Sequence, residues 1–265
     1  MEGFLGRLIH MPKVDRRRAG VGAAAALSAA IAAGGAGVAP ASADGCENVI
    51  TSTHGTLTAK EVPGNGDTVS GNVDGSGCDI VVFVDDDLNV TVTGTLHDAN
   101  RFGVYNDGNV VVDGAEIFNI GNHSAGDFDP NGVQTGVGVY INGNASEATG
   151  SVGDSNIHDY QKGGIVVNGV NAEASIEDNR VRGLGPFKDI AQNGIQAGFG
   201  ATLTELSGNK VTDNIYTAGA AKPFVSTGIL IYQAELGGIA DNQVLPTIER
   251  NNDVHRNQAN VTVIN

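Results

Sequence analysis

The chain has 265 residues, 39 of them glycine, with no tryptophan and a formal net charge of −15 at pH 7. An acidic surface repels nucleic acid and anionic membranes at long range, so neither is expected as a partner. Glycine at this abundance also argues against helices, since each glycine inside a helix costs about 1 kcal/mol relative to alanine.

The first 43 residues have the order of a secretory signal peptide. Residues 16–18 are three arginines, residues 19–38 are rich in Ala, Gly and Val, and residues 41–43 read Ala-Ser-Ala before Asp44. We expect cleavage there and a secreted mature protein, by either general or twin-arginine export. The alternative of a retained membrane anchor is disfavoured because the apolar stretch is weakly hydrophobic and broken by glycine. No later segment is apolar enough to enter a bilayer.

Both cysteines, Cys46 and Cys78, follow the expected leader. Exported chains meet an oxidising environment, so we expect a disulfide that closes a loop of about 30 residues. Two buried free thiols are the alternative. A metal site is disfavoured, because two thiols this far apart in the chain are too few ligands.

A glycine followed by an aliphatic residue recurs at intervals of 26 to 35 residues, which predicts a solenoid whose repeats bury their apolar faces by stacking. Around each copy, runs rich in Val, Ile and Thr alternate with polar residues, as short β-strands do. Asparagine precedes an aliphatic residue at Asn179, Asn209 and Asn242, which predicts a ladder of amide hydrogen bonds at one corner. The glycines are Gly103, Gly138, Gly164, Gly194 and Gly228.

With its glycine strands, asparagine corner and coils of this length, the chain resembles right-handed parallel β-helix repeat proteins, the broad group that includes pectate-lyase-like folds. The resemblance covers about residues 64–265 and matches no specific enzyme family. It implies an all-β, single-stranded right-handed parallel β-helix of about seven to nine coils. We expect residues 44–63 to cap the N-terminal end and residues 245–265 to add a closing strand. No segment shows a convincing helical period.

Alternation along the glycine strands predicts which side chains point outward from the coils. Val104 and its equivalents point inward, while Tyr105, Tyr140 and Gln196 form an exposed row. Long loops beside this row are expected to wall a groove. Amides and tyrosines suit sugar hydroxyls and planar sugar faces, although ordinary loop polarity is the alternative. The further candidate substrate-binding residues are Gln134, Gln161, Gln192 and Lys188.

Three aspartates form the best-defined acidic cluster in the sequence. Aligning residues 89 and 109 places Asp85 in the tyrosine row, with Asp87 and Asp107 in the row beside it. Stacked carboxylates bind a hard cation such as Ca²⁺ or raise one another's pKa, and a close pair also suits glycoside hydrolysis. The alternative is that these aspartates are turn residues.

Lyases on this fold commonly use Lys or Arg to abstract a proton, with Ca²⁺ neutralising the substrate. Lys162 directly precedes a glycine strand beside Tyr140, which makes it the candidate base, and a solvated surface lysine is the alternative. His97–Asp98 and His158–Asp159 occupy matching repeat positions. Neighbours on a strand face opposite ways, so we do not expect acid–base pairs there.

These patterns together predict a secreted, monomeric protein that binds an extracellular or cell-wall polysaccharide along the first parallel sheet. Whether it also cleaves that polysaccharide, as a lyase or a hydrolase, stays open, and Ca²⁺ is the only expected cofactor. The alternative function is a non-catalytic structural or surface-interaction solenoid, of the adhesin or matrix kind. An ice-binding solenoid is disfavoured, because the threonines Thr91 and Thr93 have no continuation on other coils.

Overall fold

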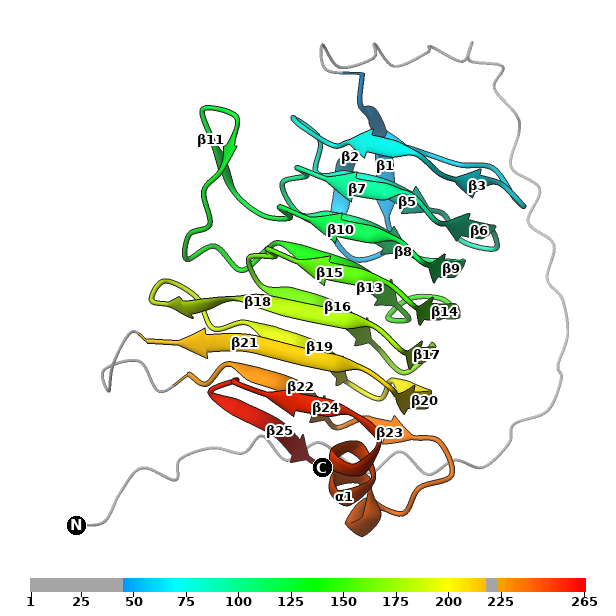
Figure 1. Ribbon diagram of the computed structural model, residues 1–265. Helices are drawn as coiled ribbons and strands as arrows, with labels where there is room; N and C mark the ends of the chain where they lie inside the picture. The colour runs from blue at the N-terminus through cyan, green and yellow to red at the C-terminus, as the bar shows by residue number, and fades with distance from the viewer. Residues whose placement is uncertain (1–44, 218–223) are drawn as a thin grey trace, which may run out of the picture. The chain divides into compact units, whose positions relative to one another are not determined.

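The computed structural model describes residues 45–217 and 224–265, so the expected signal peptide lies outside the described residues. Strands stack in three sheets along one axis, and the chain visits the sheets in the same order on each turn (Figure 1). Apart from the β1–β2 pair, all strand pairs within these three sheets are parallel. The all-β class and the parallel stacking are therefore confirmed, and both are consistent with a β-solenoid.

The first sheet has nine strands. They are β1 (Glu47–Thr51), β2 (Gly55–Glu61), β5 (Ile80–Val84), β8 (Phe102–Asn106), β13 (Val137–Asn142), β16 (Gly163–Asn168), β19 (Asn193–Gly198), β22 (Thr227–Tyr232) and β25 (Ala259–Ile264). The glycine strands of the sequence are β8, β13, β16, β19 and β22, and β25 is the last strand expected near the C-terminus.

The second and third sheets each contain seven strands among the described residues, within the expected range of coils. The second sheet is β3 (Thr68–Val69), β6 (Asn89–Val92), β9 (Asn109–Asp113), β14 (Ala148–Gly153), β17 (Ala172–Glu177), β20 (Thr202–Ser207) and β23 (Glu235–Leu236). The third is β4 (Asn72–Asp74), β7 (Thr95–His97), β10 (Glu116–Phe118), β15 (Asn156–His158), β18 (Arg180–Phe187), β21 (Lys210–Tyr216) and β24 (Asp253–His255).

The recurring glycine is explained by the close approach of successive coils. A Cβ atom on Gly138 would lie 2.7 Å from the carbonyl oxygen of Gly164, and one on Gly164 would lie 2.6 Å from that of Gly194. Any larger residue would push the next coil away. The aliphatic residues that follow these glycines stack in register and are fully buried, as predicted: Val104, Val139, Ile165, Ile195 and Ile229.

The asparagine ladder exists, but its third member is not the predicted one. The amide of Asn179 donates to Asn209 Oδ1 at 3.0 Å, and the amide of Asn209 donates to Asn252 Oδ1 at 2.9 Å. The predicted Asn242 lies instead in helix α1 (Asp241–Asn251), which the sequence reading missed. The residue with positive φ at this corner is also not the asparagine but the one before it, such as Asp178 at 56°.

Helix α1 has a short but readable helical signal. Val244 and Ile248 are four residues apart and are 4% and 0% exposed, so one turn of the helix buries both against the last coil. Pro246 lies inside the helix, and it obscures the pattern because proline usually ends one. The helix is inserted before β24, so Asn252, which directly follows the helix, still occupies the next position of the asparagine ladder.

An antiparallel hairpin, β1–β2, begins the described part of the chain at the edge of the first sheet, and its turn lies over the outer face of that sheet. Its apolar residues Val49 and Leu57 join a second, smaller apolar cluster that is separate from the coil interior and includes Phe83. The predicted disulfide is confirmed, since Cys46 before β1 is bonded to Cys78 before β5 with a Cα–Cα distance of 5.8 Å.

We expect the double substitution Cys46→Ser and Cys78→Ser to lower the free energy of unfolding by about 3–4 kcal/mol, because the bond closes a loop of 32 residues in the unfolded chain. Urea unfolding of both proteins, with and without reductant, measures this. The variant serves as its own control, since reductant has nothing to act on there. Equal stability of the oxidised wild type and the variant would contradict the expectation.

Candidate functional site

The two tyrosines predicted to be exposed are covered. Tyr105 is 0% exposed and Tyr140 is 8% exposed, although both side chains point outward from the first sheet, as the alternation predicted. The turn of the β1–β2 hairpin lies over them: the ring of His54 is 5.6 Å from each tyrosine ring, and Thr53 Oγ1 lies 2.9 Å from the hydroxyl of Tyr105. The prediction of an open tyrosine row is therefore wrong.

Asp107 is buried beneath the same hairpin turn. Its Oδ2 accepts a hydrogen bond from the backbone N–H of Ser52 at 2.9 Å, and its Oδ1 accepts from the Ser52 hydroxyl at 2.7 Å. The amide of Asn142 lies 2.7 Å from the same Oδ1. These contacts fasten the hairpin to the sheet, so the carboxylate already has protein donors on both oxygens.

The register of the aspartates also differs from the prediction. Phe83, not Asp85, pairs with Tyr105, and the pairing of Val84 with Asn106 puts Asp85 beside Asp107. The reason is that residues 85–88 connect β5 to β6, whereas only residues 107–108 connect β8 to β9. Asp85 is exposed and lines a shallow hollow of about 310 Å³ with Asp107. Asp87 is an exposed turn residue with a φ of 61° and does not line that hollow.

Two of the predicted glutamines are fully buried and hold the loops in place. Gln161 Oε1 accepts from the backbone N–H groups of Asn122 and Asn131 at 3.1 and 3.0 Å. Gln192 Oε1 accepts from the N–H of Leu184 at 3.0 Å. Both side chains therefore position the walls beside the first sheet and do not line its surface. Gln196 is half-buried and accepts from the amide of Asn193 at 2.8 Å.

The main concave site lies where three loops meet beside β16 and β19. This loop cleft has a volume of about 420 Å³ and contains two of the predicted residues, Lys162 and Gln134. Lys188 is exposed and does not line it. The sequence reading missed several lining residues, although it expected the loops that carry them. The full lining is Gly132, Gln134, Lys162, Asp189, Ile190, Ala191, Asn193, Tyr216, Phe224 and Val225.

Lys162 is the best-prepared reactive group in the loop cleft. It is half-buried, and its Nζ donates to the carbonyl oxygen of Ala191 at 3.0 Å. Burial lowers the pKa of the Lys162 amine below its usual 10.5, because the charged form loses hydration. No ion pair to Lys162 is found within the described ranges. The lowered pKa gives Lys162 a larger fraction of the neutral, proton-accepting amine at a given pH than a fully solvated lysine has.

A second hollow adjoins the loop cleft and shares Gln134 with it. This tyrosine hollow, of about 310 Å³, is lined by Tyr140 and Arg101 among others. Arg101 Nε lies 3.2 Å from Asp79 Oδ1, so its charge is partly balanced. Burial raises the pKa of Tyr140 to about 12 and, together with Arg101, lowers that of His54. The remaining lining residues are His54, Phe102, Val133, Thr135 and Val137.

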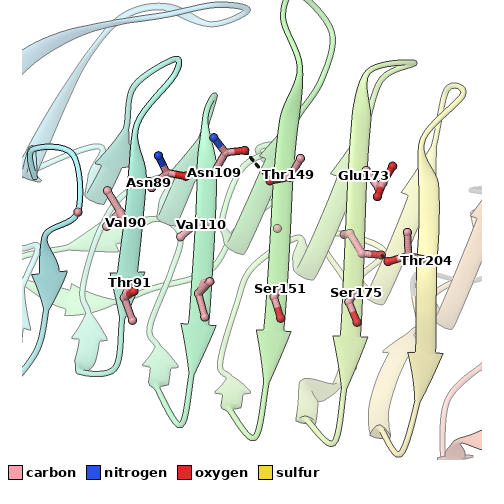
Figure 2. Close-up of a pocket in the computed structure, with 14 residues that line it drawn as sticks. Asn89, Val90, Thr91, Asn109, Val110, Thr149, Ser151, Glu173, Ser175 and Thr204 are labelled. Carbon is pink, nitrogen blue, oxygen red and sulfur yellow. Dashed lines mark hydrogen bonds between the residues drawn. The ribbon is translucent and has the colours of Figure 1, made fainter.

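The outer face of the second sheet forms a shallow hollow of about 400 Å³ (Figure 2). Thr91, Ser151 and Ser175 lie along one line across the strands, and a second line of side chains includes Asn109 and Thr149 (Figure 2). The Thr149 hydroxyl donates to Asn109 Oδ1 at 2.6 Å. This surface is wide and built mainly from small polar groups, so it offers hydrogen bonds to a partner.

No protein-family model matches the chain, and no curated protein or solved structure is significantly similar to it. The fold class therefore rests on the strands and registers of this chain. Within the part of the chain that the structure describes, no helix is long and apolar enough to cross a membrane.

We expect stability to fall with rising pH above pH 10, in part through Tyr140. The raised pKa means that the folded state keeps the phenol proton up to about pH 12, whereas the unfolded chain loses it near pH 10. The contribution of Tyr140 is therefore complete below pH 10, and about 2–3 kcal/mol is lost as pH rises to about 12.

Urea unfolding of the wild type and of Tyr140→Phe between pH 9 and pH 11.5 isolates this contribution. The other buried tyrosines are common to both proteins and cancel in the comparison. The phenylalanine variant should lose less stability over this range. Identical pH dependences in the two proteins would show that Tyr140 does not titrate as stated.

Proposed function

We propose that the protein binds an extracellular or cell-wall polysaccharide in the loop cleft and the adjoining tyrosine hollow. The observation that carries the proposal is the lining of the loop cleft, where aromatic rings, amides and one partly desolvated amine converge. The rings belong to Tyr216 and Phe224, the amides to Gln134 and Asn193, and the amine to Lys162.

This lining matches the surface of a sugar ring. A pyranose presents an apolar face of C–H groups, which packs on aromatic rings, and a rim of hydroxyl groups, which exchange hydrogen bonds with amides. Such sites bind through shape and hydrogen bonding without a high density of charge, as the acidic composition of this chain requires. Gln134 borders both hollows, so a polymer can run from one into the other.

Lyase-type cleavage is the proposed chemistry of this site. Lys162 would remove the proton α to a uronate carboxylate. The released electron pair would form a carbon–carbon double bond as the glycosidic carbon–oxygen bond breaks, and the departing oxygen would take a proton from solvent. The lowered pKa of Lys162 supports the role of base. Arg101, in the tyrosine hollow, is the cation best placed to balance a uronate carboxylate.

The remaining expectations enter as parts of the same proposal. Ca²⁺ beside Asp85 and Asp107 would assist a uronate-containing substrate, and it is supported by their shared hollow.

The coils are taken to close as a single-stranded right-handed parallel β-helix of the pectate-lyase-like type, because parallel crossovers are right-handed in about 98% of cases. The disulfide supports an oxidising compartment and hence secretion after removal of residues 1–43, as a monomer with a cap at 44–63 and a β-helix domain at 64–265.

A non-catalytic role is the second candidate, and one observation favours it. The second-sheet face in Figure 2 carries small hydroxyl side chains on several strands, with Thr91, Ser151 and Ser175 in one line that only Val111 interrupts. A regular polar surface of this kind suits adhesion to a repetitive partner without any reaction. In that case, the loop cleft would have no part in binding.

A panel of polysaccharides tests the proposal, read out by affinity electrophoresis for binding and by absorbance near 235 nm for unsaturated uronate. We expect Phe224→Ala and Gln134→Ala to weaken binding about 5- to 30-fold, as removal of single packed or hydrogen-bonding groups does. Ser175→Ala on the second-sheet face is the matched control and should leave binding unchanged. Loss of binding in the control alone would support the non-catalytic candidate instead.

Lys162→Ala tests the chemistry separately from binding. We expect the rate of absorbance increase to fall at least 100-fold while binding changes little, since general-base catalysis contributes about 10²–10⁴-fold. Lys188→Ala, an exposed lysine outside the cleft, should keep full activity. In the wild type, the rate should rise with pH and level off once the pH exceeds the pKa of Lys162, which lies below 10.5. Full activity of Lys162→Ala would overturn its role.

A further inference from the structure

We propose that a divalent transition-metal ion such as Zn²⁺ binds on the outer face of the third sheet. Its ligands are Asp74, His97 and Asp98, whose ligand atoms converge, together with His123, whose Nε2 faces Asp98 from a loop. We call these four residues the His–Asp cluster. It lies on a different sheet from the loop cleft, and the proposal does not depend on the polysaccharide function.

The strand register brings the first part of the cluster together. Asp74 ends β4 and pairs directly with His97, which ends β7. Asp98 follows with a φ of 62°, a left-handed conformation that breaks the alternation of the strand and turns its carboxylate back toward His97. One ligand atom from each of these three residues lies within 4.8 Å of the other two. The expectation that His97 and Asp98 face opposite ways is therefore wrong.

His158–Asp159 has the same geometry, so the arrangement is a feature of the repeat. Asp159 has a φ of 50°, and His158 Nδ1 lies 2.7 Å from Asp159 Oδ2, the same distance as from His97 Nδ1 to Asp98 Oδ2. The ring of Phe118 stacks between the two histidine rings, at centroid distances of 5.2 and 5.3 Å. The rotamer of His97 is thus held in place before any ligand arrives.

What distinguishes Asp98 from the other aspartates at this corner is its counter-charge. Asp159 lies 3.6 Å from Arg182, and Asp213 forms an ion pair with Arg256. Among the ion pairs of the described residues, those of Asp98 involve only histidines, His97 and His123. A permanent cation therefore balances the other two aspartates but not Asp98.

His123 is oriented as a ligand toward Asp98. It lies in β11 (His123–Ser124), which with β12 (Asp127–Phe128) forms the hairpin that projects from the side of the stack in Figure 1. Its Nδ1 lies 2.9 Å from the carbonyl oxygen of Gly121, which can only accept, so Nδ1 carries the proton. The lone pair of the neutral ring is then on Nε2. This is the usual arrangement for a metal-binding histidine.

Nε2 of His123 is buried, has no hydrogen-bond partner and lies 3.5 Å from Asp98 Oδ1. Two acceptor atoms facing each other in a buried place repel, and a cation between them removes the repulsion. The distance is too long for a charge-assisted hydrogen bond, which measures about 2.7–2.9 Å. Two ligands of a tetrahedral zinc ion, each about 2.0–2.1 Å from the metal, lie roughly 3.3 Å apart.

The surrounding contacts orient the carboxylates. Asn119 donates to Asp98 Oδ1 at 3.0 Å, and Ser76 donates to Asp74 Oδ1 through both its N–H and its hydroxyl, at 2.9 and 2.6 Å. Donors of this kind fix carboxylate ligands around metals. Asp74 is exposed, so an ion can enter from its side. Mixed imidazole and carboxylate ligands favour zinc and related transition ions over Ca²⁺, which prefers an all-oxygen site.

The test is calorimetric titration of Zn²⁺ into the tag-free, disulfide-bonded protein after treatment with a chelator, with Ca²⁺ in parallel. We expect one Zn²⁺ site and a rise in the melting temperature when it is filled. His123→Ala should weaken that site at least 100-fold, and Asp98→Asn should weaken it similarly. His158→Ala is the matched control, because it removes a histidine of identical geometry that lacks a facing second histidine, and it should stay within about twofold of the wild type.

The opposite results would overturn the proposal. No Zn²⁺ binding by the wild type, or equal binding by His123→Ala, would mean that the contact between His123 and Asp98 is balanced by a proton. If Asp98→Asn fails to fold, His123→Gln keeps the test intact, since His123 lies in a peripheral hairpin. Equal loss in His123→Ala and His158→Ala would assign the binding to surface histidines in general.

Discussion

The close stacking of one coil on the next is the constraint on which the rest of this structure depends. A single coil has too little apolar surface to form a core, and it buries its aliphatic residues only when its neighbours lie against it. At the glycine strands this contact is so close that the carbonyl oxygen of Gly164 takes the space a side chain on Gly138 would need. The strands are therefore held in register, and residues at equivalent positions stack. The asparagine ladder through Asn179 and Asn209 is the polar consequence of the same stacking.

Because stacking settles the interior and the registers, functional chemistry is confined to what the repeat leaves variable. The β1–β2 hairpin converts part of the outer face of the first sheet into a second apolar cluster, with Tyr105 enclosed and Asp107 tied to Ser52. The open surface is displaced toward the loops that precede the glycine strands. Buried glutamines, Gln161 and Gln192, hold those loops, and Lys162 is left facing the cleft between them.

The corner after the third sheet shows how a repeat can vary in charge without changing shape. A left-handed residue follows each of several strands there, and aspartate recurs because it tolerates that conformation. Each such aspartate needs a positive partner once it is partly buried. Arginine supplies it for Asp159 and Asp213, whereas Asp98 faces a neutral imidazole from a loop, and the proposed metal ion would balance its charge. The difference arises from the loop and not from the coil.

The strands, the inward rows, the disulfide and the loops beside the first sheet can be predicted from the sequence, because each depends on local alternation, spacing or turn chemistry. The sequence also marked Lys162 and Gln134, since both precede a glycine strand. The cover of the hairpin over Tyr140 joins segments that are far apart in the chain, so local patterns do not reveal it. The position of Asp85 beside Asp107 was also missed, because a two-residue difference in turn length shifts the register. The meeting of His123 with Asp98 was also beyond the sequence, since it joins a left-handed corner to a loop 25 residues further along the chain.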